Sequence, residues 1–375
     1  MCRISSRVAN SGAASEAFLC LSRYDSRRDP CAVIPFPLSD PAKSLRASEE
    51  LRQAAQRGDP KAQDGLGLCY SRGDGVSQDH KQAVKWYRLS AAQGFHWGQY
   101  HLGFCYEMGD GVAKDLAEAV KWYRLAADQA NLEAQNDLAM CYEQGRGVAK
   151  NVAEAVELFR HAAERGHEGA QFNLGLCYKE GSGVPHDISE AVKWFRLAAE
   201  QGVPEAQNNL GTCYKEGRGV PKDMAEAVKY YRSAAERGLP VGQFNLGWCY
   251  LNGTGVPEDA AEAARWFRQS AESGDAEAQA QYGACLLHGN GVPLDEAEAV
   301  KWYRKAAEQG EVNGQYALGL CYADGCGIAR NYDAARRWLR LAADQSCEDA
   351  AKELQQLDSM EVRPFWQRLL RHLWP

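Results

Sequence analysis

A cysteine recurs every 36 residues through most of this chain, and this fixed interval constrains the fold more than any other feature of the sequence. The copies run from Asp59 to Ser346 without an insertion or deletion. A strict period of this length is typical of a solenoid of stacked helical pairs, which offers a long surface and no enclosed catalytic pocket. The eight cysteines that mark the copies are Cys69, Cys105, Cys141, Cys177, Cys213, Cys249, Cys285 and Cys321.

The chain's charge and hydropathy exclude several classes of partner. A net charge of −7 argues against nucleic-acid binding, which needs a basic face to displace counterions. No apolar run approaches the roughly 18 residues of a membrane helix. The first 21 residues contain arginines but no continuous apolar stretch, so we do not expect a secretory signal. The alternatives for this segment are an organelle-targeting peptide and a disordered leader without a targeting role.

The cysteine spacing predicts free, buried thiols, although 13 cysteines would also suit a disulfide framework. Equivalent residues of neighbouring repeats lie roughly 8–10 Å apart, the usual helix-packing distance. A disulfide needs Cα atoms within about 7 Å. With one thiol per repeat, the column can neither pair along its length nor gather the ligands of a zinc site. We therefore expect no metal, no cofactor and a reducing compartment such as the cytoplasm.

The repeat from residue 131 to 166 shows how the two helices of a unit are encoded. Ala134, Leu138 and Cys141 recur at helical spacing and predict a first helix, which Gly145 ends. The second helix opens on an N-capping residue three positions before a glutamate. We expect a capping box, in which the glutamate bonds back to the cap. The full pairs are Asp115–Glu118, Asp187–Glu190, Asp223–Glu226, Asp259–Glu262 and Asp295–Glu298.

The segment from Ala206 to Gly238, AQNNLGTCYKEGRGVPKDMAEAVKYYRSAAERG, resembles the Sel1-like repeat family, a relative of the tetratricopeptide repeat. The resemblance extends over all eight copies. It implies an all-α, right-handed superhelical solenoid of antiparallel helix pairs that acts as an adaptor or scaffold. A cysteine-rich bacterial branch of the family carries two cysteines per repeat and a proposed penicillin-related activity. Only one cysteine recurs in every repeat of this chain, which therefore departs from that branch.

The regions outside the repeats follow from the same period. We expect a disordered leader over 1–45, a capping half-repeat over 46–58, eight repeats over 59–346 and a capping helix over 347–358. Residues 359–375 form a basic amphipathic tail, with apolar residues on one face and Arg363, Arg368, Arg371 and His372 on the other. This tail suits a membrane surface, a partner's groove or its own last helix. Membrane contact is expected only through residues 361–375.

Two columns do not vary between repeats, and we interpret both as architecture. One is a glutamine near the start of each first helix, from Gln63 to Gln315, and the other is an arginine in each second helix, from Arg88 to Arg340. The arginines suit an anion-binding stripe or surface ion pairs with acids four residues on. We favour the ion pairs because acids flank the arginines throughout.

Positions that vary between repeats are better binding candidates. Asn173, Asn209 and Asn245 hold one position in three consecutive first helices, with Asp137 at the same position in the repeat before them. An amide both donates and accepts, so this column suits the backbone of an extended peptide. Aromatic residues precede several of these positions and recur one turn later; they either form apolar pockets or pack repeat against repeat. The predicted partner-binding residues are Tyr100, Phe104, Asp137, Phe172, Asn173, Asn209, Phe244, Asn245, Trp248 and Tyr316.

No motif in the sequence predicts catalysis. There is no GK dipeptide for a phosphate loop, no HExxH and no Ser-x-x-Lys pair, and the eight histidines are scattered. We therefore expect a non-enzymatic adaptor that binds a protein or extended peptide on the concave, first-helix surface. The alternatives are a hydrolase of the cysteine-rich type and a membrane-attached adaptor that uses the tail. The sequence predicts neither the partner nor the oligomeric state.

Overall fold

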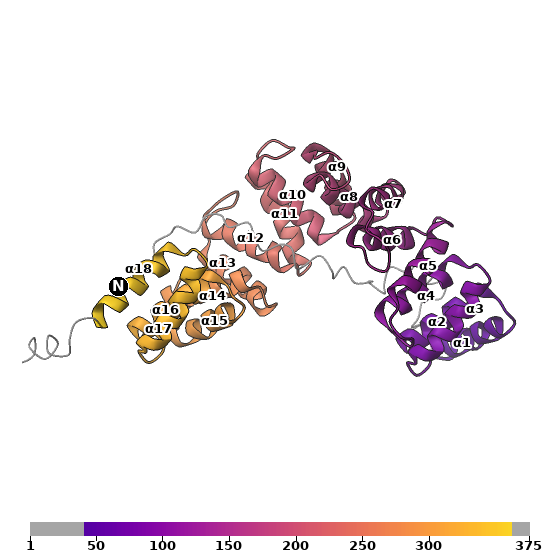
Figure 1. Ribbon diagram of the computed structural model, residues 1–375, viewed down its shortest axis with the longest axis horizontal. Helices are drawn as coiled ribbons and strands as arrows, with labels where there is room; N and C mark the ends of the chain where they lie inside the picture. The colour runs from indigo at the N-terminus through magenta and orange to yellow at the C-terminus, as the bar shows by residue number, and fades with distance from the viewer. Residues whose placement is uncertain (1–40, 362–375) are drawn as a thin grey trace, which may run out of the picture. The chain divides into compact units, whose positions relative to one another are not determined.

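The computed structural model describes residues 41–361, and over this range the chain forms eighteen α-helices and no strand (Figure 1). Over residues 41–164 and 188–361, each helix packs against the next helix along the chain. The fold is therefore the predicted all-α solenoid. Residues 1–40 and 362–375 lie outside the described residues, and these include most of the predicted leader and tail.

Each repeat contributes two helices. The first helices are α2 (Pro60–Arg72), α4 (His96–Met108), α6 (Leu132–Gln144), α8 (Glu168–Glu180), α10 (Pro204–Glu216), α12 (Pro240–Leu251), α14 (Ala276–His288) and α16 (Val312–Asp324). The second helices are α3 (His80–Ala92), α5 (Leu116–Ala127), α7 (Val152–Glu164), α9 (Ile188–Glu200), α11 (Met224–Glu236), α13 (Ala260–Glu272), α15 (Glu296–Glu308) and α17 (Tyr332–Asp344).

One further helix lies at each end of the repeats. Helix α1 (Pro41–Gln56) packs on α2, and α18 (Glu348–Glu361) packs on α17. Helix α1 starts five residues before the half-repeat expected from residue 46. Helix α18 continues three residues past the cap expected to end at 358.

The described part of the chain divides into two compact units. Unit 1 holds residues 41–174 and 182–184, and unit 2 holds residues 175–181 and 185–361. The division falls within α8, in the fourth repeat. Each unit is an array of helix pairs with its own apolar core.

The N-termini of the second helices are capped as predicted, but the expected return bond from the glutamate was wrong. The Asp115 carboxylate accepts from the backbone N–H of Glu118 at 3.0 Å. The backbone N–H of Asp115 instead donates to the Tyr106 carbonyl at 2.9 Å, and the Glu118 carboxylate accepts from Lys121 Nζ at 2.7 Å. The N–H of the cap is thus used to hold the second helix to the first, which leaves the glutamate free to pair with lysine.

Two glycines in each turn are required by the backbone. Gly109 ends α4 with φ of 83°, in the left-handed region that disfavours other residues. Gly111, also at positive φ, lies so close to α3 that a Cβ there would collide with the carbonyl oxygen of His80. The Gly-x-Gly spacing therefore both stops the first helix and lets the turn pack against the preceding second helix.

The core of most repeats is built from alanines, one leucine of the first helix and one large ring of the second helix. Tyr123, Phe159, Phe195 and Phe267 are fully buried or nearly so. The eight repeat cysteines are buried and free, as predicted. Burial raises the pKa of the Cys105 and Cys141 thiols to about 12. The thiols of this column therefore serve as small apolar core residues.

In five repeats the arginine of this column donates to a tyrosine and not to the acid four residues on, so the predicted ion pairs were wrong there. Arg124 donates to the Tyr142 hydroxyl at 2.7 Å, and Arg232 donates to the Tyr250 hydroxyl at 2.8 Å. In both cases the tyrosine lies 18 residues on, in the first helix of the following repeat. The arginines therefore connect one repeat to the next, which a reading of one helix alone does not show. The other arginine–tyrosine pairs are Arg88–Tyr106, Arg196–Tyr214 and Arg304–Tyr322.

Candidate partner-binding face

The predicted partner-binding residues all lie on first helices. The first helices begin and end at equivalent positions of the repeat, to within one residue, so equivalent residues lie on the same face of their own helices. Tyr100 and Phe104 lie on α4, Asp137 on α6, Phe172 and Asn173 on α8, Asn209 on α10, Phe244, Asn245 and Trp248 on α12, and Tyr316 on α16.

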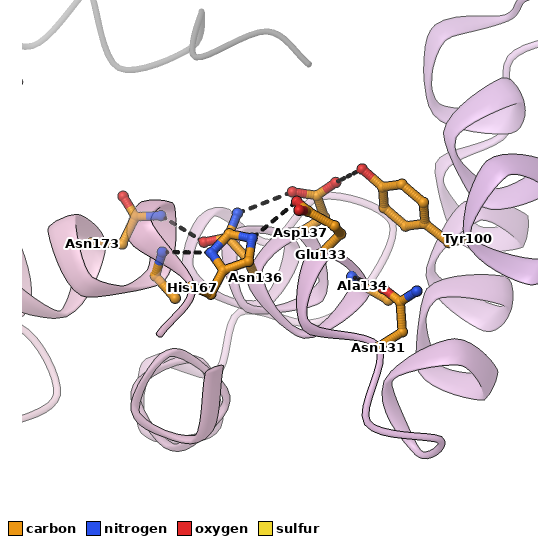
Figure 2. Close-up of polar contacts among 9 residues, drawn as sticks. Tyr100, Asn131, Glu133, Ala134, Asn136, Asp137, His167 and Asn173 are labelled. Carbon is orange, nitrogen blue, oxygen red and sulfur yellow. Dashed lines mark hydrogen bonds and ion pairs between the residues drawn. The ribbon is translucent and has the colours of Figure 1, made fainter. Parts of the chain in front are cut away.

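In unit 1, three of these residues belong to one chain of hydrogen bonds, drawn in Figure 2. The Tyr100 hydroxyl donates to Asp137 Oδ2 at 3.1 Å, and Asn136 Nδ2 donates to Asp137 Oδ1 at 3.1 Å. Asn173 Nδ2 donates in turn to Asn136 Oδ1 at 3.0 Å. This polar chain runs across α4, α6 and α8 and connects three consecutive repeats.

A histidine and a glutamate lie beside this chain in Figure 2. His167 Nδ1 accepts from the backbone N–H of Ala170 at 3.0 Å, so Nε2 carries the hydrogen that faces Glu133 Oε2 at 2.9 Å. Burial lowers the pKa of His167, but the bond to Glu133 and the neighbouring carboxylates outweigh it, and the net shift is upward. The histidine therefore caps α8 and pairs with α6 at the same time.

The Asp137 carboxylate is bonded only to neutral donors. Burial, and then the negative charges of Glu107 and Glu133, raise its pKa to about 7. Glu107 itself is paired with Arg146 at 2.7 Å and accepts from the Tyr123 hydroxyl at 2.6 Å. Asp137 is thus poised to change charge near neutral pH, in contrast to an ordinary surface aspartate.

In unit 2, the remaining asparagines of the column also have partners within the chain. Asn245 Nδ2 donates to Asn208 Oδ1 at 2.9 Å, in the same register as the Asn173–Asn136 bond. Asn209 Nδ2 donates to the Glu205 carbonyl at 2.9 Å, and its Oδ1 accepts from Lys179 Nζ at 3.0 Å. All three predicted asparagines are half-buried, so each keeps part of its amide at the surface.

The predicted aromatic residues contribute to the core as well as to this face. Tyr100 is only 3% exposed, and its ring lies 5.8 Å from that of Tyr123. Phe244 and Trp248 are half-buried and form an edge-on pair at 6.2 Å. Both rings also pack on the buried ring of Phe267, at 5.7 and 5.9 Å. Phe104, Phe172 and Tyr316 are half-buried as well.

The sequence analysis missed a buried ion-pair position between the first two repeats. His101 Nδ1 lies 2.8 Å from Asp64 Oδ1, and both side chains are almost fully buried. The pair spans 37 residues, as do Asn136–Asn173 and Asn208–Asn245. The signal that would have revealed it is this offset of one repeat plus one residue, which joins polar residues of adjacent first helices.

The described residues contain neither a metal-binding cluster nor a membrane-spanning helix. Between residues 41 and 361, no group of three or more His, Cys, Asp or Glu side chains is arranged to hold a metal ion. No helix in the same range has the length and apolar character to cross a bilayer.

Comparison with known proteins assigns the class defined by this fold. A family profile described as Sel1 repeat matches eight consecutive segments: 60–95, 98–131, 132–167, 169–203, 204–239, 240–275, 276–311 and 312–347. These segments are repeats of a helical-repeat solenoid, and the chain belongs to the Sel1 repeat family. The family is generally one of non-enzymatic repeat scaffolds that bind proteins.

Two solved structures are similar along most of the chain. A protective antigen of uropathogenic Escherichia coli that displays an SLR fold shares 39% identity, with a TM-score of 0.72, over 82% of this chain and 66% of its own. A Sel1 repeat protein from Oxalobacter formigenes shares 34% identity, with a TM-score of 0.60, over 82% of this chain and 89% of its own. This chain thus spans just under two thirds of the first of these proteins. No curated protein matches it.

Proposed function

We propose that this chain is a non-enzymatic adaptor or scaffold that holds a partner protein, or an extended segment of one, along the concave surface formed by its first helices. The observation that carries the proposal is the asparagine column. Asn173, Asn209 and Asn245 occupy one position in three consecutive first helices and are half-buried. Each is fixed by an internal bond, so its exposed polar atoms are held in place before a partner arrives.

Aromatic residues beside the column supply apolar contact. Phe172 and Phe244 immediately precede Asn173 and Asn245, and Trp248 lies one turn further along α12. Rigid aromatic side chains next to fixed polar groups are typical of interface hot spots. We assign partner contact to Tyr100, Phe104, Asp137, Phe172, Asn173, Asn209, Phe244, Asn245, Trp248 and Tyr316, with Tyr100 contributing mainly through its hydroxyl.

The net charge and the free thiols bear on the class of partner and on the cellular compartment. The net charge of −7 disfavours nucleic acid, so we propose a protein or peptide partner. Eight buried free thiols suit a reducing compartment, for which we propose the cytoplasm.

The test compares two triple variants by affinity capture of cellular partners. Asn173→Ala, Asn209→Ala and Asn245→Ala remove the column. Leu197→Ala, Ser233→Ala and Gln269→Ala change second-helix positions of the same three repeats without altering net charge. We expect partners to be lost from the first variant and kept by the second. Because each asparagine also makes an internal bond worth about 1 kcal/mol, melting is measured in parallel. Equal capture by both variants would contradict the proposal.

A further inference from the structure

In seven of the eight repeats, a glutamine near the start of the first helix donates to a carbonyl of the preceding helix. Gln63 Nε2 donates to the Ala55 carbonyl at 3.2 Å, and Gln279 Nε2 donates to the Ala271 carbonyl at 3.2 Å. The same bond is made by Gln135, Gln171, Gln207, Gln243 and Gln315. The carboxamide is buried in each case, so its oxygen needs a donor as well.

In four repeats that donor is a second glutamine, 30 residues on, at the end of the second helix of the same repeat. Gln93 Nε2 donates to Gln63 Oε1 at 2.8 Å. The other three Gln–Gln pairs are Gln129–Gln99 at 2.8 Å, Gln309–Gln279 at 2.8 Å and Gln345–Gln315 at 2.9 Å. The pair therefore ties the end of a second helix to the start of its own first helix.

In three other repeats the second glutamine is replaced. Among the described residues, Oε1 of Gln135, Gln207 and Gln243 has no hydrogen-bond partner, although these side chains are only 4%, 5% and 6% exposed. The residues 30 positions on are Arg165, Arg237 and Ser273. A Gln–Gln pair is therefore missing in repeat 3 (131–166), repeat 5 (203–238) and repeat 6 (239–274).

The structure shows where two of the replacing side chains go instead. The Ser273 hydroxyl donates to the Gln269 carbonyl of its own helix at 3.1 Å. The Arg237 guanidinium covers the turn glycine Gly202, where a Cβ would lie 3.0 Å from it. Neither side chain reaches the glutamine oxygen, which stays buried without the bond that the other repeats make.

From this we infer that the Gln–Gln pair closes a repeat, and that repeats 3, 5 and 6 are the ones that open locally and adjust when a partner binds. A buried oxygen without a donor is hydrated when the repeat opens, so opening costs less where the pair is missing. These repeats carry Asp137, Asn209, Asn245 and Trp248. The link to partner binding rests on the proposed function, whereas the difference in local opening does not.

Hydrogen exchange measured by mass spectrometry on the free, full-length chain tests the first part of the inference, that repeats 3, 5 and 6 open more easily than the others. Protection of the last turn of α7, α11 and α13 should be lower than that of α3, α5, α15 and α17. Ser273→Gln creates the pair in repeat 6 and should slow exchange at the end of α13 by roughly three- to tenfold, the effect of one net hydrogen bond. Gln309→Ser removes it from repeat 7 and should accelerate exchange at the end of α15 by the same factor.

The two substitutions are matched, because both positions are exposed and the bond is gained in one variant and lost in the other. Unchanged protection in Ser273→Gln, or in Gln309→Ser, would overturn the inference. Protection would stay unchanged in Ser273→Gln if a water molecule already donates a hydrogen bond to Gln243 Oε1. Added partner should then slow hydrogen exchange in repeats 3, 5 and 6 more than in repeats 1, 2, 7 and 8. Uniform protection would overturn the second part of the inference, that these three repeats adjust when a partner binds. If no partner binds while the free chain behaves as expected, only the proposed function fails.

Discussion

Arg268 Nε donates to Glu272 Oε1 at 2.7 Å, one turn along the same helix. Equivalent arginines such as Arg232 instead donate to a tyrosine in the following repeat. The difference follows from one residue: the position 18 residues after Arg268 is Leu286, which has no hydroxyl to accept the bond. Arg268 therefore pairs with an acid of its own helix, because the next repeat offers it no tyrosine.

This relationship predicts that the tyrosine hydroxyl matters more than the acid. Tyr250→Phe removes the acceptor of Arg232 and should lower the free energy of unfolding by about 0.5–1.5 kcal/mol, the net value of one hydrogen bond. Glu272→Gln breaks an exposed ion pair and should cost less than the tyrosine substitution, because solvent screens the pair. Urea unfolding of both variants checks the order. A larger loss in Glu272→Gln would reverse our interpretation of the column.

Native thiol labelling should divide the cysteines of the described residues into two classes. Burial raises the pKa of the Cys249 and Cys285 thiols to about 11, so little thiolate forms near neutral pH, and the side chains are shielded as well. Cys326 and Cys347 are only half-buried and should react first. Peptide mapping after a short treatment with a thiol reagent measures this. Rapid native labelling of several repeat cysteines would show that the column is not a core feature.

The Asp137 carboxyl should make stability depend on pH. Its folded-state pKa of about 7 lies above the ordinary value of 3.8, so between these values the folded chain holds a proton that the unfolded chain has released. The contribution of this group to stability therefore falls as pH rises from about 4 to 7. Asp137→Asn removes this dependence. The melting temperature of the variant should therefore rise relative to that of the wild type as pH increases.

Melting curves from pH 5 to 8 compare wild type, Asp137→Asn and a control, Asp128→Asn, at an exposed position. The control changes net charge by the same amount and should run parallel to the wild type. If Asp137→Asn also runs parallel, then the carboxyl is ionised across this range, and the polar chain in Figure 2 carries a full negative charge.

The fold could be predicted from the sequence because it depends on features that repeat within one unit. The glycine pair, the N-caps and the helical spacing of alanines each act over a few residues, and the structure places them as expected at Gly145 and Asp115. The 36-residue period then determines that such units stack.

The contacts of the candidate site could not be predicted in the same way, because they depend on the offset between repeats. Glu118 was expected to bond back to Asp115, yet the Tyr106 carbonyl already takes that N–H. Asn173 was predicted as a partner-binding residue, but its bond to Asn136 across a separation of 37 residues was not predicted. Offsets of 18, 30 and 37 residues arise from how neighbouring helices pack, which the pattern of one helix does not contain.

The most direct test of the central claim is photo-crosslinking in cells from two positions of unit 2. A photoreactive amino acid replaces either Trp248, half-buried on first helix α12, or Leu197, which is 42% exposed on second helix α9. Adducts are identified by mass spectrometry. If partners bind along the first helices, position 248 should give specific protein adducts and position 197 should give none. Adducts from position 197 alone would contradict the account.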